Sequence, residues 1–392
     1  MKIPLNKTYL GGHEFSYIAE LLATEDISSD GDFSRRCAGL LEQRYSIQKV
    51  LLTPSCTAAL ELACILSNVG PNDEVILPSF TFASTANAFV RAGAKPVFVD
   101  IRPDTLNIDE RLVEAAITER TKVICPVHYG GVACEMDHLL ALASRYNLTI
   151  IEDAAQGLDG AYGDRALGSI GTMGAFSFHS TKNHSCGEGG ALCINDVSLL
   201  ERAEIIRDKG TNRSQFMRGE VDKYTWVDVG GSFIPSELTA ALLLAQLEMS
   251  DGIARRRRIV HEFYDYHFER LQDQELLRLP VVPTHCQSNH HLYYIILPDT
   301  QTRDSLQQHL YENGISAASH FVPLHSSPMG QSFGYRDGNL PVTEDLSGRL
   351  LRLPIYPQLS EHEQMFVVRK VRSYLRQTQL ITVPRRRLIG VR

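Results

Sequence analysis

The sequence predicts an α/β protein with a mixed seven-stranded sheet and a second, smaller α+β region toward the carboxyl end. Two observations predict this class. Short β-branched runs alternate with helix-length amphipathic runs from about residue 48 to 195, and polar residues directly follow several of these runs. The 392 residues are enough for about two or three domains, and with 43% hydrophobic residues the chain can form a large core.

Seven runs rich in β-branched and apolar residues are the expected strands of the sheet. They are Lys49–Thr53, Glu74–Leu77, Pro96–Val99, Lys122–Val127, Leu148–Glu152, Gly174–Phe178 and Gly190–Ile194. Four runs between them have the apolar spacing of helices that pack on a sheet, namely Thr57–Ser67, Ala83–Ala92, Asp109–Ala116 and Asp137–Tyr146.

The carboxyl-terminal part begins with a long helix expected over Glu237–Phe268. Mixed elements follow it: a strand over Leu292–Leu297, a helix over Arg303–Asn313 ended by Gly314, and a last helix over Glu361–Leu375. We therefore expect a large domain over residues 1–250 that includes an amino-terminal arm, a small α+β domain over 251–378, and a basic, solvated tail over 379–392.

Composition excludes some classes of function. The net charge is -7, so no overall basic field would hold a nucleic acid. No stretch approaches the ~18 apolar residues of a membrane span, which favours a cytoplasmic protein without a membrane partner. The eight cysteines have neither paired nor zinc-site spacing, so we expect buried reduced thiols and no metal.

The first candidate site residues lie where the first strand turns into a helix. Thr53-Pro54-Ser55-Cys56-Thr57-Ala58 consists of small and hydroxylated residues, and the free N–H groups of a helix N-terminus suit a phosphate. A Ser or Thr that only caps the helix would have the same sequence. The run has no Walker lysine and no GxGxxG pattern, so it does not indicate a nucleoside triphosphatase or a dinucleotide site.

An acid and a lysine follow two later strands. Asp153 ends the run 148–152, and Lys182 comes 182 − 153 = 29 residues later, before the glycine-rich turn Gly187–Gly190. Taken singly, the acid could cap a turn and the lysine could be solvated. Together with a phosphate cradle they are what pyridoxal phosphate requires, because the lysine amine bonds to the aldehyde and the acid keeps the pyridine nitrogen protonated.

At this point the chain resembles the DegT/DnrJ/EryC1/StrS family of pyridoxal-phosphate sugar aminotransferases, from about Ile3 to Leu375. The resemblance is carried by Ser55–Leu60, Pro78–Phe82, Pro126–Gly130, Glu152–Gln156, Ser177–His179 with Lys182-Asn183, and Gly187–Gly190. It implies the fold type I of pyridoxal-phosphate transferases, which is the aspartate aminotransferase-like fold, and a homodimer with a shared active site.

The resemblance also implies roles for individual residues. Lys182 would be the residue that bonds to the cofactor, with Asp153 at the pyridine nitrogen and Gln156 near the ring oxygen. Phe82 would stack on the ring, and the phosphate would be held by Cys56, Thr57, Ala58 and Ser177. Ser232 would reach the phosphate in a second subunit, at a position where related enzymes have Asn. His320 and His325 would lie near the sugar nucleotide.

Within the family, Lys209–Phe216 and Asp222–Trp226 resemble members that aminate dTDP-4-keto-6-deoxy-D-glucose with L-glutamate. These two compounds are therefore the expected substrates, for surface polysaccharide biosynthesis. The alternatives are amination of a UDP- or GDP-linked sugar or at C3, a sugar dehydratase of the same fold, and a non-catalytic sugar-nucleotide-binding regulator. A nicotinamide dehydrogenase ranks last, because the glycine fingerprint is missing.

Overall fold

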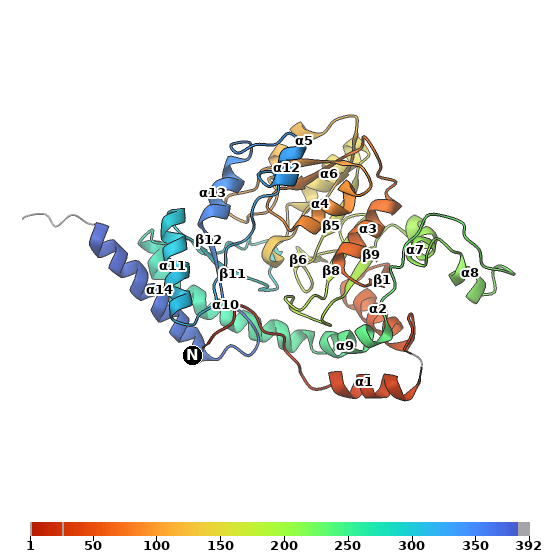
Figure 1. Ribbon diagram of the computed structural model, residues 1–392, viewed down its shortest axis with the longest axis horizontal. Coiled ribbons are helices and arrows are strands. Elements are labelled where there is room, and N and C mark those ends of the chain that lie inside the picture. Colours follow the sequence, from red (N-terminus) through yellow and green to blue (C-terminus); the bar gives the residue numbers. More distant parts are fainter. Residues whose placement is uncertain (1, 26, 383–392) are drawn as a thin grey trace, which may run out of the picture.

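The computed structural model describes residues 2–25 and 27–382, and a seven-stranded sheet forms its centre (Figure 1). The strand order is β1-β9-β8-β5-β4-β2-β3. The strands are β1 (Lys49–Thr53), β2 (Glu74–Pro78), β3 (Lys95–Val99), β4 (Thr121–Ile124), β5 (Thr149–Asp153), β8 (Met173–Ser177) and β9 (Gly190–Ile194). All seven expected strands are present; β1 and β9 have the expected ends, and the ends of the other five are shifted.

The sheet is mixed because one strand runs against the rest. β9 pairs antiparallel with both β1 and β8, while β8, β5, β4, β2 and β3 pair in parallel. The carboxyl ends of β5 and β8 consequently lie side by side at one edge, which is where ligands bind in open α/β sheets. This pairing brings the residues after the two strands together.

Helices cover both faces of the sheet, as the alternation of side chains along the strands requires. Leu51, Val75 and Leu77 pack in one buried cluster with α3 (Cys56–Leu66), α4 (Ala83–Val90) and α7 (Leu200–Arg207). Side chains pointing the other way pack in two clusters, formed with α2 (Asp32–Tyr45) and α9 (Glu237–Leu247), and with α5 (Glu110–Ala116) and α6 (Met136–Tyr146).

The carboxyl-terminal elements surround a two-stranded sheet of β11 (Tyr293–Ile296) and β12 (Leu350–Leu353). Their core is built from α10 (Ser250–Asp273), α11 (Thr300–Glu312) and α14 (Glu361–Thr382), and it also contains Ile3 from the start of the chain. The remaining helices are α1 (Glu14–Ala23), α8 (Arg213–Met217), α12 (Pro328–Ser332) and α13 (Pro341–Arg349). The domain boundary at residue 250 stays a prediction.

Two sequence expectations differ from the structure here. The helix expected over Glu237–Phe268 is split into α9 and α10 by a turn at residues 248–249, after which the buried Ser250 hydroxyl bonds to His184. The last helix, α14, runs beyond Leu375 and includes residues 379–382 of the expected tail. The rest of that tail, 383–392, lies outside the described residues.

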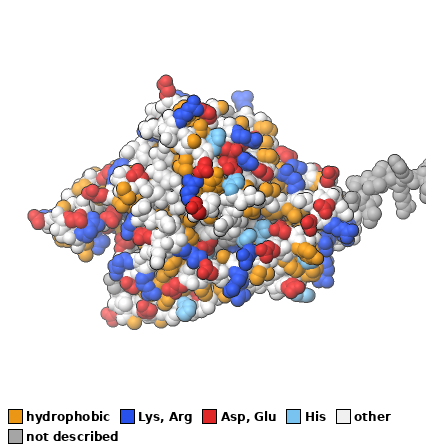
Figure 2. Space-filling model, turned by 180° about the vertical axis from the view of Figure 1, so that it is seen from behind, with side chains coloured by type: hydrophobic (Ala, Val, Ile, Leu, Met, Phe, Trp, Pro, Cys, Tyr) orange, Lys and Arg blue, Asp and Glu red, His pale blue; other side chains and the backbone are white. Residues whose placement is uncertain are grey.

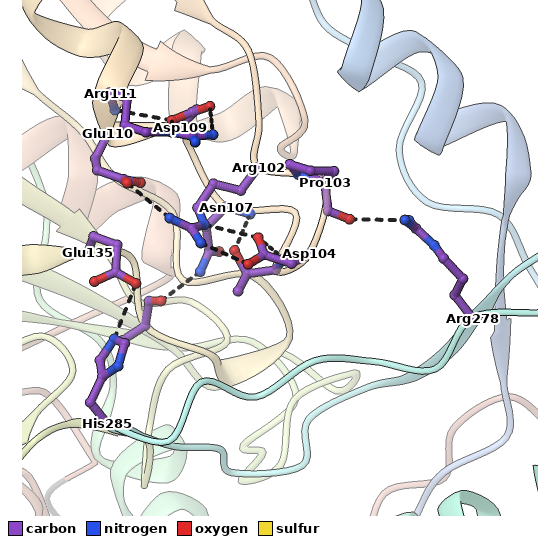
Figure 3. A network of polar contacts seen from close by, with 12 residues as sticks. Arg102, Pro103, Asp104, Asn107, Asp109, Glu110, Arg111, Glu135, Arg278 and His285 are labelled. Carbon is purple, nitrogen blue, oxygen red and sulfur yellow. Dashed lines mark hydrogen bonds and ion pairs between the residues drawn. The ribbon is translucent and has the colours of Figure 1, made fainter. Parts of the chain in front are cut away.

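A polar network ties the loop after β3 to neighbouring segments (Figure 3). Arg102 binds the carboxylates of Asp104 and Glu110, and Arg278 donates to the Pro103 carbonyl. Asn107 donates to the carbonyls of residues 132 and 133 and accepts from the Tyr129 N–H. The network therefore fixes the short helix η1 (Tyr129–Gly131), which follows β4 at the ligand-binding edge of the sheet.

Charged side chains of both signs lie on the surface (Figure 2), and the cysteines lie in the interior. On the face shown in Figure 2, acidic and basic side chains are intermixed over the described residues. In the described part of the chain, no helix is long and apolar enough to cross a membrane. All eight cysteines are buried and free of disulfide bonds, as expected.

Candidate active site

A cavity of about 520 Å³ opens at the carboxyl ends of β5 and β8. It is lined by the residues that follow several sheet strands, together with side chains from β12 and the segment before β11. Asp153 and Lys182 both line it. The structure thus brings together the acid and the lysine that lie 29 residues apart in the sequence.

Asp153 is the last residue of β5 and is 5% exposed. Its Oδ2 accepts a hydrogen bond from Thr85 Oγ1 at 2.7 Å, and its Oδ1 accepts one from the Ala155 N–H at 3.1 Å. Thr85 in turn accepts from Thr81, because its own proton is directed at the carboxylate. No ion pair to Asp153 occurs among the described residues, so this buried carboxylate can accept a cationic N–H partner from the cavity.

Lys182 lies in the turn after β8, where its N–H donates to the His179 carbonyl. Burial lowers the pKa of its amine, and the thiol of Cys56 and the carboxylate of Asp153 offset only part of this effect. A lowered pKa raises the fraction of neutral amine at a given pH. Since the neutral form is the nucleophile, the position of Lys182 suits attack on an aldehyde.

The N-terminus of α3 forms another wall of the cavity. Ser55 caps the helix by accepting from the Ala58 N–H at 3.1 Å, and the Thr57 hydroxyl donates to Ser84. Cys56, Thr57 and Ser177 line the cavity, whereas Ala58 is not among the lining residues. A Cβ on Gly190 would lie 2.3 Å from the Ser55 carbonyl carbon, so only glycine allows β9 to pass this close to the cradle.

Phe82 and Gln156 also lie at the cavity, as the sequence predicts. Phe82 is 64% exposed at the start of α4, with its ring 6.5 Å from that of Phe321. The side-chain oxygen of Gln156 accepts from the Gly130 N–H at 2.7 Å, which leaves its amide N–H₂ available. Both side chains can therefore contact a ring held over Asp153.

The two expected histidines lie in different surroundings. His320 lines the cavity, stacks on Phe321 and shares a hydrogen bond with the Tyr129 hydroxyl, and burial lowers its pKa to about 2. His325 is fully buried and does not line the cavity. Its ring bridges Ser79 Oγ at 2.7 Å and Glu344 Oε1 at 2.8 Å, so it links two loops.

Ser232 lies away from the cavity of its own chain. It is exposed and pairs through its backbone with Asp208, beside the segment that projects with α8 from the body of the molecule (Figure 1). A contact with a cofactor phosphate would therefore have to be made in a second copy of the chain. The expectation of such a contact stays a prediction.

The cavity residues that sequence reasoning missed include two basic side chains from the carboxyl-terminal part, Arg352 and His291. Arg352 lies on β12, donates to the Ser319 carbonyl at 3.3 Å, and has a buried Nε without a partner among the described residues. Burial lowers its pKa. The sequence does contain a signal for Arg352, because it is a lone arginine inside the apolar run Leu350–Leu353. A charged residue in an otherwise apolar strand indicates a binding site for a ligand of opposite charge.

These groups fit pyridoxal phosphate. The buried carboxylate of Asp153 lacks a cationic partner among the described residues, the amine of Lys182 faces the same cavity, and the N–H groups of Cys56 and Thr57 have no backbone acceptor in the described structure. Fold and site together define a class: pyridoxal-phosphate-dependent aminotransferases of the aspartate aminotransferase-like fold.

Comparison with known proteins is consistent with this class and shows the family. The model of the DegT/DnrJ/EryC1/StrS aminotransferase family matches residues 9–372, so the chain belongs to that family. It is 34% identical over 385 residues to the spore coat polysaccharide biosynthesis protein SpsC of Bacillus subtilis, covering 95% of this chain and 97% of SpsC. To the GDP-perosamine synthase of Escherichia coli O157:H7 it is 30% identical over 378 residues, with 95% and 98% covered.

Solved structures agree in fold. The putative sugar aminotransferase Spr1654 from Streptococcus pneumoniae, in its PMP form, superposes with a TM-score of 0.88 at 26% identity, covering 97% of this chain and all of that one. The same protein is also known in a PLP form. The chain is thus an aminotransferase of this family, and its site fits the pyridoxal phosphate cofactor that Spr1654 holds.

Proposed function

We propose that the protein transfers the amino group of L-glutamate to C4 of dTDP-4-keto-6-deoxy-D-glucose. The products are dTDP-4-amino-4,6-dideoxy-D-galactose and 2-oxoglutarate, made in the cytoplasm for surface polysaccharide biosynthesis. The observation that carries the proposed chemistry is the shared cavity of Asp153 and Lys182. The choice of sugar rests on the resemblance of Lys209–Phe216 and Asp222–Trp226 to members that use this substrate.

In this proposal the residues of the cavity divide the work of holding the cofactor. The N-terminus of α3, with Cys56 and Thr57, and the hydroxyl of Ser177 bind the phosphate, with Ala58 contributing through the local backbone. Phe82 covers one face of the ring and Gln156 donates to its oxygen. When bound, pyridoxal phosphate supplies an electron sink that stabilises negative charge at the carbon bonded to the amino group.

Asp153 and Lys182 carry the chemical steps assigned to the chain. Asp153 would hold a proton on the ring nitrogen, and the hydrogen bonds from Thr85 and Ala155 orient its carboxylate. The amine of Lys182, once displaced by glutamate, removes the proton from the α-carbon of the donor. In the second half of the reaction it delivers a proton to one face of C4, and this sets the configuration of the amino sugar.

Arg352 is proposed to bind a carboxylate of the amino donor. It is a half-buried cation on the cavity wall whose buried Nε lacks a partner in the described structure, and it lies close enough to Lys182 to affect the lysine pKa. The α-carboxylate of glutamate is bonded to the carbon that reacts, so its binding group must lie near Lys182. The sugar diphosphate is attached at C1, on the far side of the ring from C4.

The two histidines and a second subunit have further roles in this proposal. His320 contacts the sugar nucleotide from the cavity wall, whereas the buried hydrogen bonds of His325 give it only an indirect part through the loops it links. The active form is a homodimer in which Ser232 of each chain reaches the cofactor phosphate in the other. The free, buried cysteines fit the reducing cytoplasm.

The test is a substrate panel. The purified holoenzyme is incubated with L-glutamate and dTDP-, UDP- or GDP-linked keto-sugars, and the release of 2-oxoglutarate is followed. We expect the highest kcat/KM with dTDP-4-keto-6-deoxy-D-glucose, and a 4-amino product of galacto configuration. A preference for a UDP- or GDP-linked sugar, or amination at C3, would replace this substrate. Dehydration without amine transfer would replace the reaction, and no turnover with any sugar would favour a regulator.

A further inference from the structure

His291 is a cavity residue that the proposed mechanism does not yet use. It lies just before β11, is 5% exposed, and lines the cavity with Lys182. Its backbone is held from both sides. The fully buried Arg257 of α10 donates to the carbonyls of His290 and His291 at 3.1 and 2.6 Å, and the His291 N–H donates to Asn289 Oδ1 at 3.0 Å.

The ring of His291 has one defined tautomer because of Asn183. The Asn183 Nδ2 donates to the backbone carbonyl of Asn289 at 3.1 Å, and a carbonyl can only accept, so this contact fixes which way the amide points. Its Oδ1 then faces His291 Nδ1 at 2.9 Å. Since Oδ1 also can only accept, the ring proton lies on Nδ1, and the lone pair of Nε2 has no hydrogen-bond donor in the described part of the chain.

The charges around the ring keep that lone pair unprotonated. Four other basic groups face His291 from the elements packed against it, and they are Lys182, Arg257, His320 and Arg352. Burial and these groups, Lys182 first among them, hold the pKa of His291 well below its usual range. Nε2 is therefore an acceptor of hydrogen bonds that does not itself take up the proton.

The residue that orients the His291 ring is the chain neighbour of Lys182. Asn183 directly follows Lys182, so the Asn183–His291 hydrogen bond joins the lysine turn to the opposite wall of the cavity. A lysine bonded to the cofactor has at most one N–H, whereas a released amine has two or three and must place them. Asp153 cannot serve both the ring nitrogen and the released amine.

We propose that His291 is a positioning residue for Lys182, accepting through Nε2 a hydrogen bond from the lysine amine whenever that amine is not bonded to the cofactor. The inference rests on the proposed function and adds to it a residue that orients the released amine for the proton transfer of each half-reaction. No proton passes to His291. In each half-reaction the amine takes a proton from one carbon atom and returns it to the other, and the imidazole only accepts its hydrogen bond.

The test compares His291→Phe, which fills the space without an acceptor, with His291→Gln, which keeps a side-chain oxygen acceptor. Cofactor-free protein is mixed with pyridoxal phosphate across pH, and the rate of bonding to Lys182 is followed by absorbance. An acceptor stabilises the protonated amine more than the neutral one. His291→Phe should therefore move the midpoint of the pH–rate profile down by about one unit, while His291→Gln stays within about 0.3 units of the wild type.

A second readout and a second variant separate this role from a structural one. In steady-state assays with varied glutamate, His291→Phe should lower kcat about tenfold and leave the KM of glutamate within about twofold, because the acceptor acts on the released amine. If His291→Phe does not fold, Asn183→Leu frees the tautomer of an intact ring, and a downward shift of the midpoint of about half a unit is expected.

An unchanged midpoint in a folded His291→Phe or Asn183→Leu protein overturns the inference, as does a His291→Gln protein that behaves like His291→Phe. These outcomes differ from a failure of the proposed function. If the wild type does not bond pyridoxal phosphate, or bonds it and aminates no sugar, the proposed function fails. A wild type that does both, beside variants with an unmoved midpoint, removes only His291 from the account.

Discussion

The substitution Asp153→Asn removes the charge at the end of β5 while it keeps the shape of the side chain. The carboxylate accepts from the Thr85 hydroxyl and from the Ala155 N–H. An asparagine offers one oxygen and one N–H₂ group in their place, so one of the two donors faces another donor. The negative charge that keeps the ring nitrogen of the cofactor protonated is lost as well.

The expected loss follows from where the charge acts. A preorganised group aimed at charge that develops during the reaction contributes about 10²- to 10³-fold in kcat, which corresponds to about 3–4 kcal/mol. The unpaired donor adds a stability cost of about 1–3 kcal/mol in the apo protein. The cofactor should remain bound, because the cradle at the N-terminus of α3 is unchanged.

The assay measures 2-oxoglutarate release with saturating glutamate and keto-sugar, and cofactor occupancy by absorbance. Asp196→Asn is the matched control, because Asp196 is an exposed cap that accepts from the Ser198 N–H and does not line the cavity. We expect near-wild-type activity in the control. An Asp153→Asn enzyme with kcat within about threefold of the wild type would refute the pairing of this acid with the ring nitrogen.

Four further substitutions test the rest of the site. Lys182→Ala should abolish transamination in the 2-oxoglutarate assay and leave the circular dichroism spectrum unchanged, and measurable turnover would contradict its role. Arg352→Gln should raise the KM of glutamate ~10- to 100-fold, because a charged hydrogen bond to a carboxylate contributes about 1.5–3 kcal/mol. The dissociation constant of dTDP should change little. Weaker dTDP binding with an unchanged KM of glutamate would assign Arg352 to the diphosphate instead. His325→Ala should lower the free energy of unfolding by about 2–4 kcal/mol, because it leaves the buried Ser79 hydroxyl proton without its acceptor and removes the imidazole hydrogen bond to Glu344. The KM of the sugar nucleotide in steady-state assays should not rise, and the opposite pattern would place His325 at the substrate. Burial lowers the pKa of His320 to about 2, so this side chain stays neutral in the folded state while the unfolded chain takes up a proton below about pH 6.5. The stability present above that pH is therefore lost as the pH falls, by at most ~1.4 kcal/mol per pH unit. His320→Asn should flatten this decline in thermal unfolding between pH 6.5 and 4.5, and an equal decline would show that another group causes it.

The sequence predicts the sheet and its ligand-binding edge well, because both depend on local patterns. Each strand is a short apolar run, and the residues after β5 and β8 must meet once those strands pair in parallel. That argument alone places Asp153 and Lys182 at one cavity. The strand order and the antiparallel direction of β9 depend on long-range pairing, and only the structure shows them.

Residues that reach the site from distant segments were harder to predict. Arg352 and His291 come from the carboxyl-terminal part, and their position at the cavity depends on how that part packs beside the sheet. His325 shows the converse case. As a polar residue in a loop motif it is expected near substrate, but in the structure it lies buried between Ser79 and Glu344. Sequence patterns report a residue's neighbours along the chain, and such contacts depend on neighbours in space.

One chemical experiment tests most directly whether Lys182 is the residue that bonds to the cofactor. The holoenzyme is reduced with borohydride, digested, and analysed by mass spectrometry for the peptide that carries a pyridoxyl group. The account predicts a single modified residue, Lys182. A pyridoxyl group on any other lysine, or none on a protein that contains the cofactor, would contradict it.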